Sequence, residues 1–156
     1  MISITKKTLQ DLEFDTILQT ISDRCVTEIG KLKAGSIVPF ADKETLMDAL
    51  LQTSEYLSSF TNNNAIPNHG FDNLTNDFKL LAIEDSFLEV GSFRKIATLS
   101  ETVNTLLLFL KKFQDYYPKL NERAIQIEYT KIIIQKVDEI IDKYGEIKDN
   151  ASIELA

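Results

Sequence analysis

The sequence has few of the residues that carry catalysis, cross-links or chain breaks. Its 156 residues include one cysteine, one histidine, no tryptophan, five glycines and three prolines. The single cysteine, Cys25, excludes an internal disulfide and fits a reducing compartment. Because glycine and proline are scarce, the segments between chain breaks are long, which favours helices over the many short strands of a β-domain.

Long apolar runs and an excess of positive charge are also missing. The longest apolar stretch, 105–110, ends at Lys111 and falls short of the ~20 residues that a membrane span needs. No apolar run follows Lys6 and Lys7, so we expect no secretory signal and a cytoplasmic protein without membrane contact. The chain has 17 Lys and Arg against 24 Asp and Glu, a net charge of −7. A domain that binds nucleic acid through its own surface normally has an excess of cations, so this composition argues against such binding.

The remaining composition is that of an ordinary globular domain. Apolar residues make up 44% of the chain and charged residues 26%. One soluble domain is therefore expected. A chain of this size normally packs a core and buries roughly 68–70% of its unfolded surface.

Hydrophobic periodicity predicts an all-α fold, an irregular multi-helix core with two long helices. The first is predicted over about 89–115, with a polar face at its start that includes Arg94 and Asn104. Its second half is apolar almost all round and is expected at the centre of the core. The second is predicted over about 127–144. Its isoleucines are compatible with a strand, but their spacing favours a helix that Gly145 ends.

Shorter helices are predicted in the first half of the chain. A block over 8–23 is interrupted near 13–15, where Asp15 can cap the second part, and a helix over 27–34 ends at a left-handed Gly35. Asp42 caps a further helix, the stretch 61–70 is a loop, and Asp72 or Asn73 caps a short helix.

The C-terminus is unusual for a natural chain end. Asp149 or Asn150 resembles an N-cap, but only a few residues follow, whereas an isolated helix needs roughly 12 residues to be even marginally stable. We therefore expect the polypeptide to continue.

Few side chains are suited to catalysis. Cys25 and His69 are the candidates for a nucleophile and its base, but no motif surrounds either one. Cys25 is expected in the core and His69 in a solvated turn. A zinc site needs three or four N or S ligands, which the chain does not have, and neither the GxxxxGK[ST] nor the GxGxxG phosphate loop occurs. The sequence therefore predicts no catalytic, cofactor-binding or metal-binding residue.

Carboxylates gather near the C-terminus, at Asp138, Glu139, Asp142, Glu146 and Asp149. Such a group can in principle hold Mg²⁺ or Ca²⁺, but the glycine spacing is not that of an EF-hand. Lysines are interleaved and predict helical ion pairs such as Glu139 with Lys143, so we favour a solvated charged face.

Two stretches resemble the second bacterial branch of the MutS family of mismatch-repair proteins, here called MutS-two. TLQDLEF at 8–14, VTEIGK at 26–31 and Pro39-Phe40 resemble the family's "LEF … LGK … P" start. IIDKYGEIKDNASIEL at 140–155 resembles its "ID..GEI.D.AS.EL" stretch. Gly70-Phe71-Asp72 and Leu88 fall between them in the expected order. The stretches 62–64 and 113–127 follow no family pattern.

The resemblance implies a domain assignment and a parent protein. Residues 1–150 would be the N-terminal part of the helical core, or lever, domain, and 151–156 the start of the helix that leads to a coiled-coil clamp. The parent would be a homodimeric ATPase that binds ATP and Mg²⁺ downstream of Ala156, in many members with a Smr nuclease domain. The family is associated with suppressing recombination on branched DNA and, in some members, with rescuing collided ribosomes. This segment would be non-catalytic, with the rest of its own polypeptide as its partner.

Two other hypotheses stay open. A free-standing acidic helical adaptor would dock a partner helix through exposed apolar residues. An enzyme would use the C-terminal carboxylates with a bound divalent ion. The length of the gene separates the adaptor from the MutS-like segment.

Overall fold

The computed structural model describes residues 4–152, which form eight helices. The only β-pairing among these residues is an isolated bridge between Ile141 and Ile147. The predicted all-α fold is confirmed. Within the same residues, no helix is both long and apolar enough to cross a membrane. The helices are α1 Lys6–Asp11, α2 Phe14–Asp23, α3 Glu28–Gly35, α4 Lys43–Ser58, α5 Thr75–Leu81, α6 Val90–Lys112, α7 Pro118–Ala124 and α8 Ile132–Ile140.

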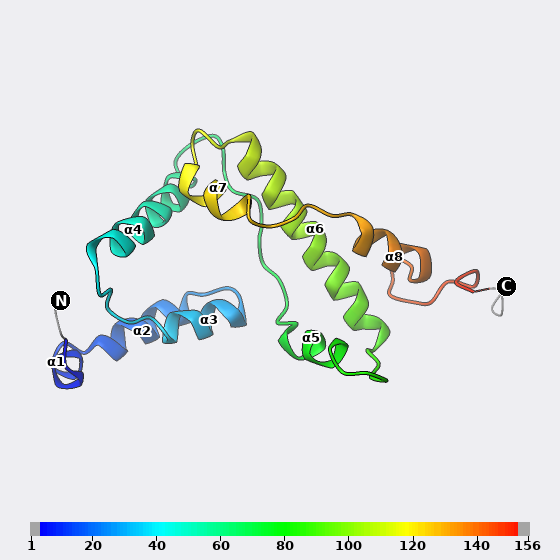
Figure 1. The fold of residues 1–156 in the computed structure, drawn as a ribbon, viewed down its shortest axis with the longest axis horizontal. Helices are drawn as coiled ribbons and strands as arrows, with labels where there is room; N and C mark the ends of the chain where they lie inside the picture. The colour runs from blue at the N-terminus through cyan, green and yellow to red at the C-terminus, as the bar shows by residue number, and fades with distance from the viewer. Residues whose placement is uncertain (1–3, 153–156) are drawn as a thin grey trace.

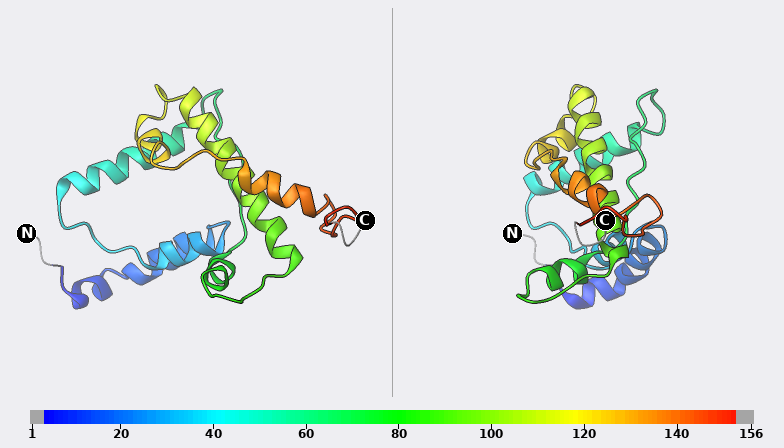
Figure 2. Two further views of the ribbon diagram at one scale, coloured as in Figure 1. Left: turned by 45° about the vertical axis from the view of Figure 1, so that its right-hand side comes forward. Right: turned by 90° about the vertical axis from the view of Figure 1, so that its right-hand side faces the viewer.

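The helices form an elongated, open arrangement (Figures 1 and 2). The long helix α6 runs through the middle of the molecule, and α7 and α8 both pack against it. Helix α4 packs on α7, whereas α1, α2 and α3 pack in sequence on one another at the N-terminal end. Helix α1 and the segment that follows α8 lie at opposite ends of the long axis (Figure 1).

The accessible surface confirms how open this arrangement is. It measures 12203 Å², whereas a compact monomer of this mass exposes about 8000 Å². The expectation of a normally packed core is therefore wrong, since most helices contact only one or two others. Large apolar side chains are exposed along the chain, including Val26 at 91% and Phe87 at 86%. The buried apolar residues among those described are few: Leu18, Ala34, Leu74, Ile96, Ala97, Tyr117, Ala124, Val137 and Ile141.

Helix α6 buries a different part of its surface from the part that its sequence predicts. Its buried residues are Ile96, Ala97 and Asn104, and a small core cluster joins Ala97 to Val137 of α8. The second half is expected at the core centre, but none of its apolar residues is buried, and Leu108 there is 55% exposed. Asn104, predicted on the polar face, is buried.

The prediction for 127–144 is right in type and wrong in length, because side-chain hydrogen bonds end the helix on both sides. Before α8, Asn104 Nδ2 donates to the Thr130 carbonyl at 2.6 Å and its Oδ1 accepts from the Thr130 N–H at 3.3 Å. After α8, the Asp142 carboxylate accepts the N–H groups of Tyr144 and Glu146 at 2.8 and 2.9 Å. These bonds fold 142–146 into a turn, and Gly145, with φ +86°, lies within it.

Some of the helix ends predicted in the first half of the chain are confirmed, and others are wrong. The break near 13–15 is confirmed, and Glu13, with φ 52°, precedes α2, so Asp15 lies in its first turn and is not its cap. Asp42 caps α4 as predicted. Gly35 is the last residue of α3 and does not have the left-handed φ that we expected. In the region without a family pattern, α7 begins at Pro118, whose missing N–H and fixed φ suit a first helical position.

Residues 149–152 form a turn and a bend. The rest of the helix predicted from Asp149 or Asn150, residues 153–156, lies outside the described residues.

Candidate functional site

The two sequence candidates for nucleophilic chemistry have separate hydrogen-bond partners. Cys25 is half-buried, not in the core as predicted, and its Sγ contacts the Ile21 carbonyl at 3.4 Å. His69 is exposed, with Nδ1 2.9 Å from the Pro67 carbonyl and Nε2 3.2 Å from the Tyr56 hydroxyl. Because a carbonyl only accepts, Nδ1 carries the proton. These hydrogen bonds pair neither side chain with the other.

The C-terminal carboxylates bind separate partners and do not converge on one point. Asp138 pairs with Arg94 of α6 at 2.5 Å, and Glu139 pairs with Lys136 at 2.7 Å, not with Lys143 as predicted. Backbone N–H groups, that of Glu146 first, lower the pKa of Asp142. Within residues 4–152, no three His, Cys, Asp or Glu side chains converge in an arrangement that could hold a metal ion.

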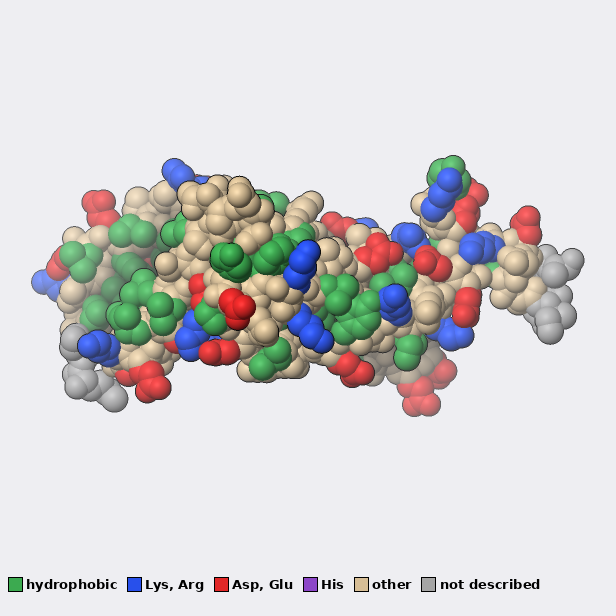
Figure 3. Space-filling view, turned by 90° about the horizontal axis from the view of Figure 1, so that it is seen from above, with side chains coloured by type: hydrophobic (Ala, Val, Ile, Leu, Met, Phe, Trp, Pro, Cys, Tyr) green, Lys and Arg blue, Asp and Glu red, His purple; other side chains and the backbone are tan. Residues whose placement is uncertain are grey.

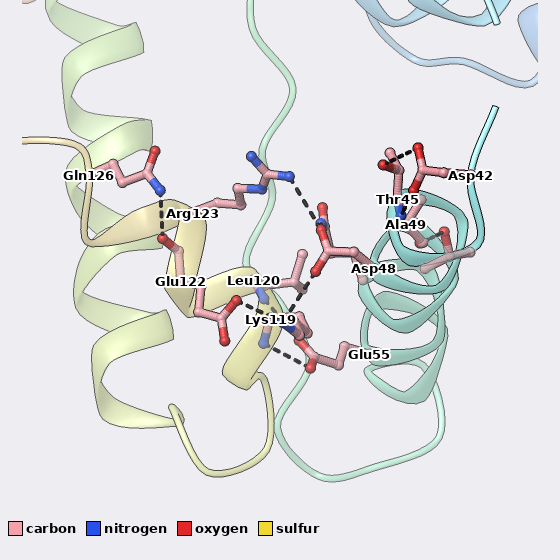
Figure 4. Close-up of polar contacts among 12 residues, drawn as sticks. Asp42, Thr45, Asp48, Ala49, Glu55, Lys119, Leu120, Glu122, Arg123 and Gln126 are labelled. Atoms are coloured by element: carbon pink, nitrogen blue, oxygen red, sulfur yellow. Dashed lines mark hydrogen bonds and ion pairs between the residues drawn. The ribbon is translucent and has the colours of Figure 1, made fainter. Parts of the chain in front are cut away.

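A carboxylate of α4 caps α7 and so orients the two helices (Figure 4). The two oxygens of Glu55 accept the backbone N–H groups of Lys119 and Leu120, both at 2.9 Å. These are the first two amides of α7, because Pro118 has none. A negative charge at this position also complements the helix dipole.

An ion-pair network lies beside this cap. Asp48 of α4 contacts Lys119 Nζ at 3.2 Å and Arg123 at 3.3 Å, and Lys119 also reaches Glu122 at 2.9 Å (Figure 4). The hydrogen bond with Lys119 lowers the pKa of Asp48, and the hydrogen bond with Glu122 raises the pKa of Lys119. The Asp48 carboxylate therefore holds α7 on α4 in its ionised form.

Tyr117 connects the α6–α7 turn to the asparagine-rich loop. Its ring is fully buried, and its hydroxyl donates to the Asn64 carbonyl at 2.5 Å and bonds with the Asn62 amide at 3.0 and 3.1 Å. No local sequence pattern predicts this contact, since its partners are far apart along the chain.

An apolar groove lies between α5, α6 and α8. This apolar groove has a volume of about 550 Å³, and Lys136 is the only charged side chain among the described residues that line it. Residues of all three helices form its walls, among them Phe78, Phe93, Ile96, Ile133, Val137 and Ile140. Figure 3 shows further apolar side chains spread along one face of the molecule, with charged groups between them.

The described residues thus define an open all-α scaffold: helices joined by polar junctions, with a large uncovered apolar surface. Comparison with known proteins shows that the chain is similar to proteins named Endonuclease MutS2. The chain is 29% identical to that of Staphylococcus carnosus, 26% to that of Alkaliphilus oremlandii and 25% to that of Symbiobacterium thermophilum, over 96–97% of its length. It spans about one fifth of the length of these relatives. No family model and no solved structure matches it. The resemblance to the second MutS branch is confirmed.

Proposed function

We propose that this chain is a non-catalytic scaffold segment of a MutS-like DNA repair and recombination ATPase, and that it links a DNA-binding clamp to the ATPase domain. The segment would correspond to the N-terminal part of the lever, over 1–150, with 151–156 leading toward the clamp. The chain contains no phosphate loop, so any ATP and Mg²⁺ would bind to other parts of the parent.

The observation that carries this proposal is the excess of accessible surface. The chain exposes 12203 Å², which is about 4200 Å² more than a compact monomer of its mass. A standard protein interface covers about 800 Å² on each partner. The excess is several times larger, and it favours a segment that the rest of a larger protein covers on several sides. Relatives about five times as long agree with this interpretation.

The junctions between helices support a mechanical role. Helices α4, α7, α6 and α8 form a continuous chain of contacts. The Glu55 cap, the Asp48 ion pairs and the Asn104 bonds to Thr130 fix its geometry at three points. Packed helices with such contacts move as rigid elements between discrete arrangements.

The gene and the full polypeptide test this proposal. The reading frame should continue beyond Ala156 into a coiled coil and a GxxxxGK[ST] loop. In the full polypeptide, the Glu55→Ala, Asp48→Ala double variant should keep basal ATP hydrolysis and lose most of its stimulation by branched DNA. The matched control, Glu101→Ala on α6, should keep both. A reading frame that stops at Ala156, or unchanged stimulation in the double variant, would overturn the linker role and favour a free-standing adaptor.

A further inference from the structure

Helices α1, α2 and α3 form a separate unit, here called the N-terminal arm. Its helices pack on one another, and within the described residues none of them packs closely on a helix of α4–α8. The arm has its own buried apolar residues, Leu18 and Ala34, and its own side-chain caps at Thr5 and Thr27. It therefore has the internal contacts of a separate rigid body.

Few contacts fix the segment that joins the arm to α4. Backbone hydrogen bonds to α3 end at Ile37, and none within the described chain involves residues 38–41. Val38 is 71% exposed, so packing restrains this segment little. Pro39 restricts its own φ angle and the residue before it, which leaves rotation to residues 40–41. Residues with so few contacts can absorb the dihedral changes of a hinge.

The turn between α2 and α3 lies beside the loop that leads into α5 (Figures 1 and 2). There, Asn73 Nδ2 donates to Glu28 Oε2 at 3.3 Å, and among the described residues this is the one hydrogen bond that joins the arm to 43–152. Val26 lies next to Gly70 but is 91% exposed, so the apolar contact at this point is small. A single exposed hydrogen bond favours the bonded position by only about 2- to 10-fold.

We propose that the N-terminal arm swings about residues 38–41 between a closed position, in which Glu28 and Asn73 form a latch, and an open position. A latch this weak leaves both positions populated, because units that no large apolar interface joins move relative to each other. Helices α4, α6, α7 and α8 keep their geometry during this movement, since their contacts with one another do not include the arm. The two positions turn the exposed apolar side chains of the arm, Val26 and Leu32 among them, in different directions.

Double electron–electron resonance on the full polypeptide measures the two positions, with spin labels on Lys31→Cys of the arm and Glu101→Cys of α6 as its only cysteines. Both positions are exposed. The native latch should give a main distance and a second, minor one. Asn73→Asp keeps the oxygen that accepts from Thr75 at the start of α5, and it places a second carboxylate opposite Glu28. The ratio of the second distance to the first should therefore increase by about tenfold.

A charge-swapped pair separates the latch from other effects of the substitution. Adding Glu28→Lys to Asn73→Asp restores an attraction between the two side chains, so the ratio should return to within about threefold of its native value. A reference pair of labels, on Ser54→Cys of α4 and Glu101→Cys of α6, should keep one distance in every variant, because α7 packs on both helices. Circular dichroism verifies the helix content of each variant.

Three results would overturn the hinged arm: one native distance that Asn73→Asp leaves unchanged, no recovery in the charge-swapped pair, or an equal change in the reference pair. None of them would affect the linker role, which depends on the accessible surface of the whole chain and not on the position of the arm.

Discussion

Replacing Glu55 by alanine removes the contact that orients α7 on α4. The substitution leaves the N–H groups of Lys119 and Leu120, now each 2.9 Å from a carboxylate oxygen, without a protein acceptor. Loss of a helix cap costs about 0.5–2 kcal/mol, and a hydrogen bond to a charged group contributes about 1.5–3 kcal/mol. Water replaces part of the loss because Glu55 is only half-buried. We therefore expect local destabilisation of α7 by about 2–3 kcal/mol.

Hydrogen exchange at the α7 amides measures this loss better than a global melt, because helices that pack in separate pairs open separately. The Lys119 and Leu120 amides should exchange roughly 30- to 150-fold faster in Glu55→Ala. Glu55→Gln, which keeps one acceptor oxygen, should fall between native and Ala. Glu101→Ala, an exposed change on α6, should stay within about 0.5 kcal/mol. If Glu55→Ala and Glu101→Ala exchange alike at α7, the cap contributes nothing and the junction argument fails.

Three further predictions concern other helix ends. Asn104→Leu should lower the free energy of unfolding in urea by about 2 kcal/mol, because it leaves the half-buried N–H and carbonyl of Thr130 without their side-chain partner. An unchanged midpoint would contradict this. Hydrogen bonds from the first turn of α4 lower the pKa of Asp42. The ionised carboxylate therefore stabilises α4 fully above about pH 4, and this stabilisation is lost as the pH falls through the lowered pKa. Native chain and Asp42→Ala should therefore differ in α4 amide exchange at pH 6 and converge near pH 2. Gly145→Ala should destabilise the chain by about 1 kcal/mol because its φ is +86°, whereas Gly35→Ala, with open space around its added methyl, should stabilise it by about 0.5–1 kcal/mol in thermal unfolding.

The sequence predicts well those features that a few neighbouring residues decide. Asp42 caps α4 because a short acceptor stands directly before a helical stretch, and that signal is complete within four residues. The break near Glu13 and the type of the α6 and α8 helices are predicted from equally local patterns. The all-α fold follows from the sum of such local signals.

Contacts between distant residues were missed. Asn104 is predicted on the polar face of α6 but is buried, and a buried polar side chain needs a hydrogen-bond partner that the sequence pattern does not identify. The partner, Thr130, ends the extended segment before α8 and so shortens the predicted helix. Tyr117 and Asn62 lie 55 residues apart, and no local pattern relates them. Only the folded arrangement brings such groups together.

The expectation of a compact core failed for a different physical reason. Periodicity shows which face of a helix is apolar, but not which chain covers that face. The relation between accessible surface and mass holds for chains whose apolar helix faces pack against each other, and in this chain many of these faces are exposed. The error is informative, because a sequence with a normal apolar content and an abnormally large accessible surface has apolar faces that other residues must cover.

Helices in this chain are joined either by charged and capped contacts or by apolar contacts. Only the apolar contacts depend strongly on being covered by other residues. Charged and capped contacts join α4 to α7, and they persist in water because their groups stay hydrated or paired. The walls of the apolar groove between α5, α6 and α8 depend on burial, and an uncovered groove forgoes about 25 cal/mol for each Å² of apolar surface left in water. A covering helix would therefore stabilise α5 and α8 far more than α4 and α7. In a scaffold that transmits movement, this difference would leave the α4–α7 junction rigid in every state and make the α5–α8 side the part that responds to what binds it.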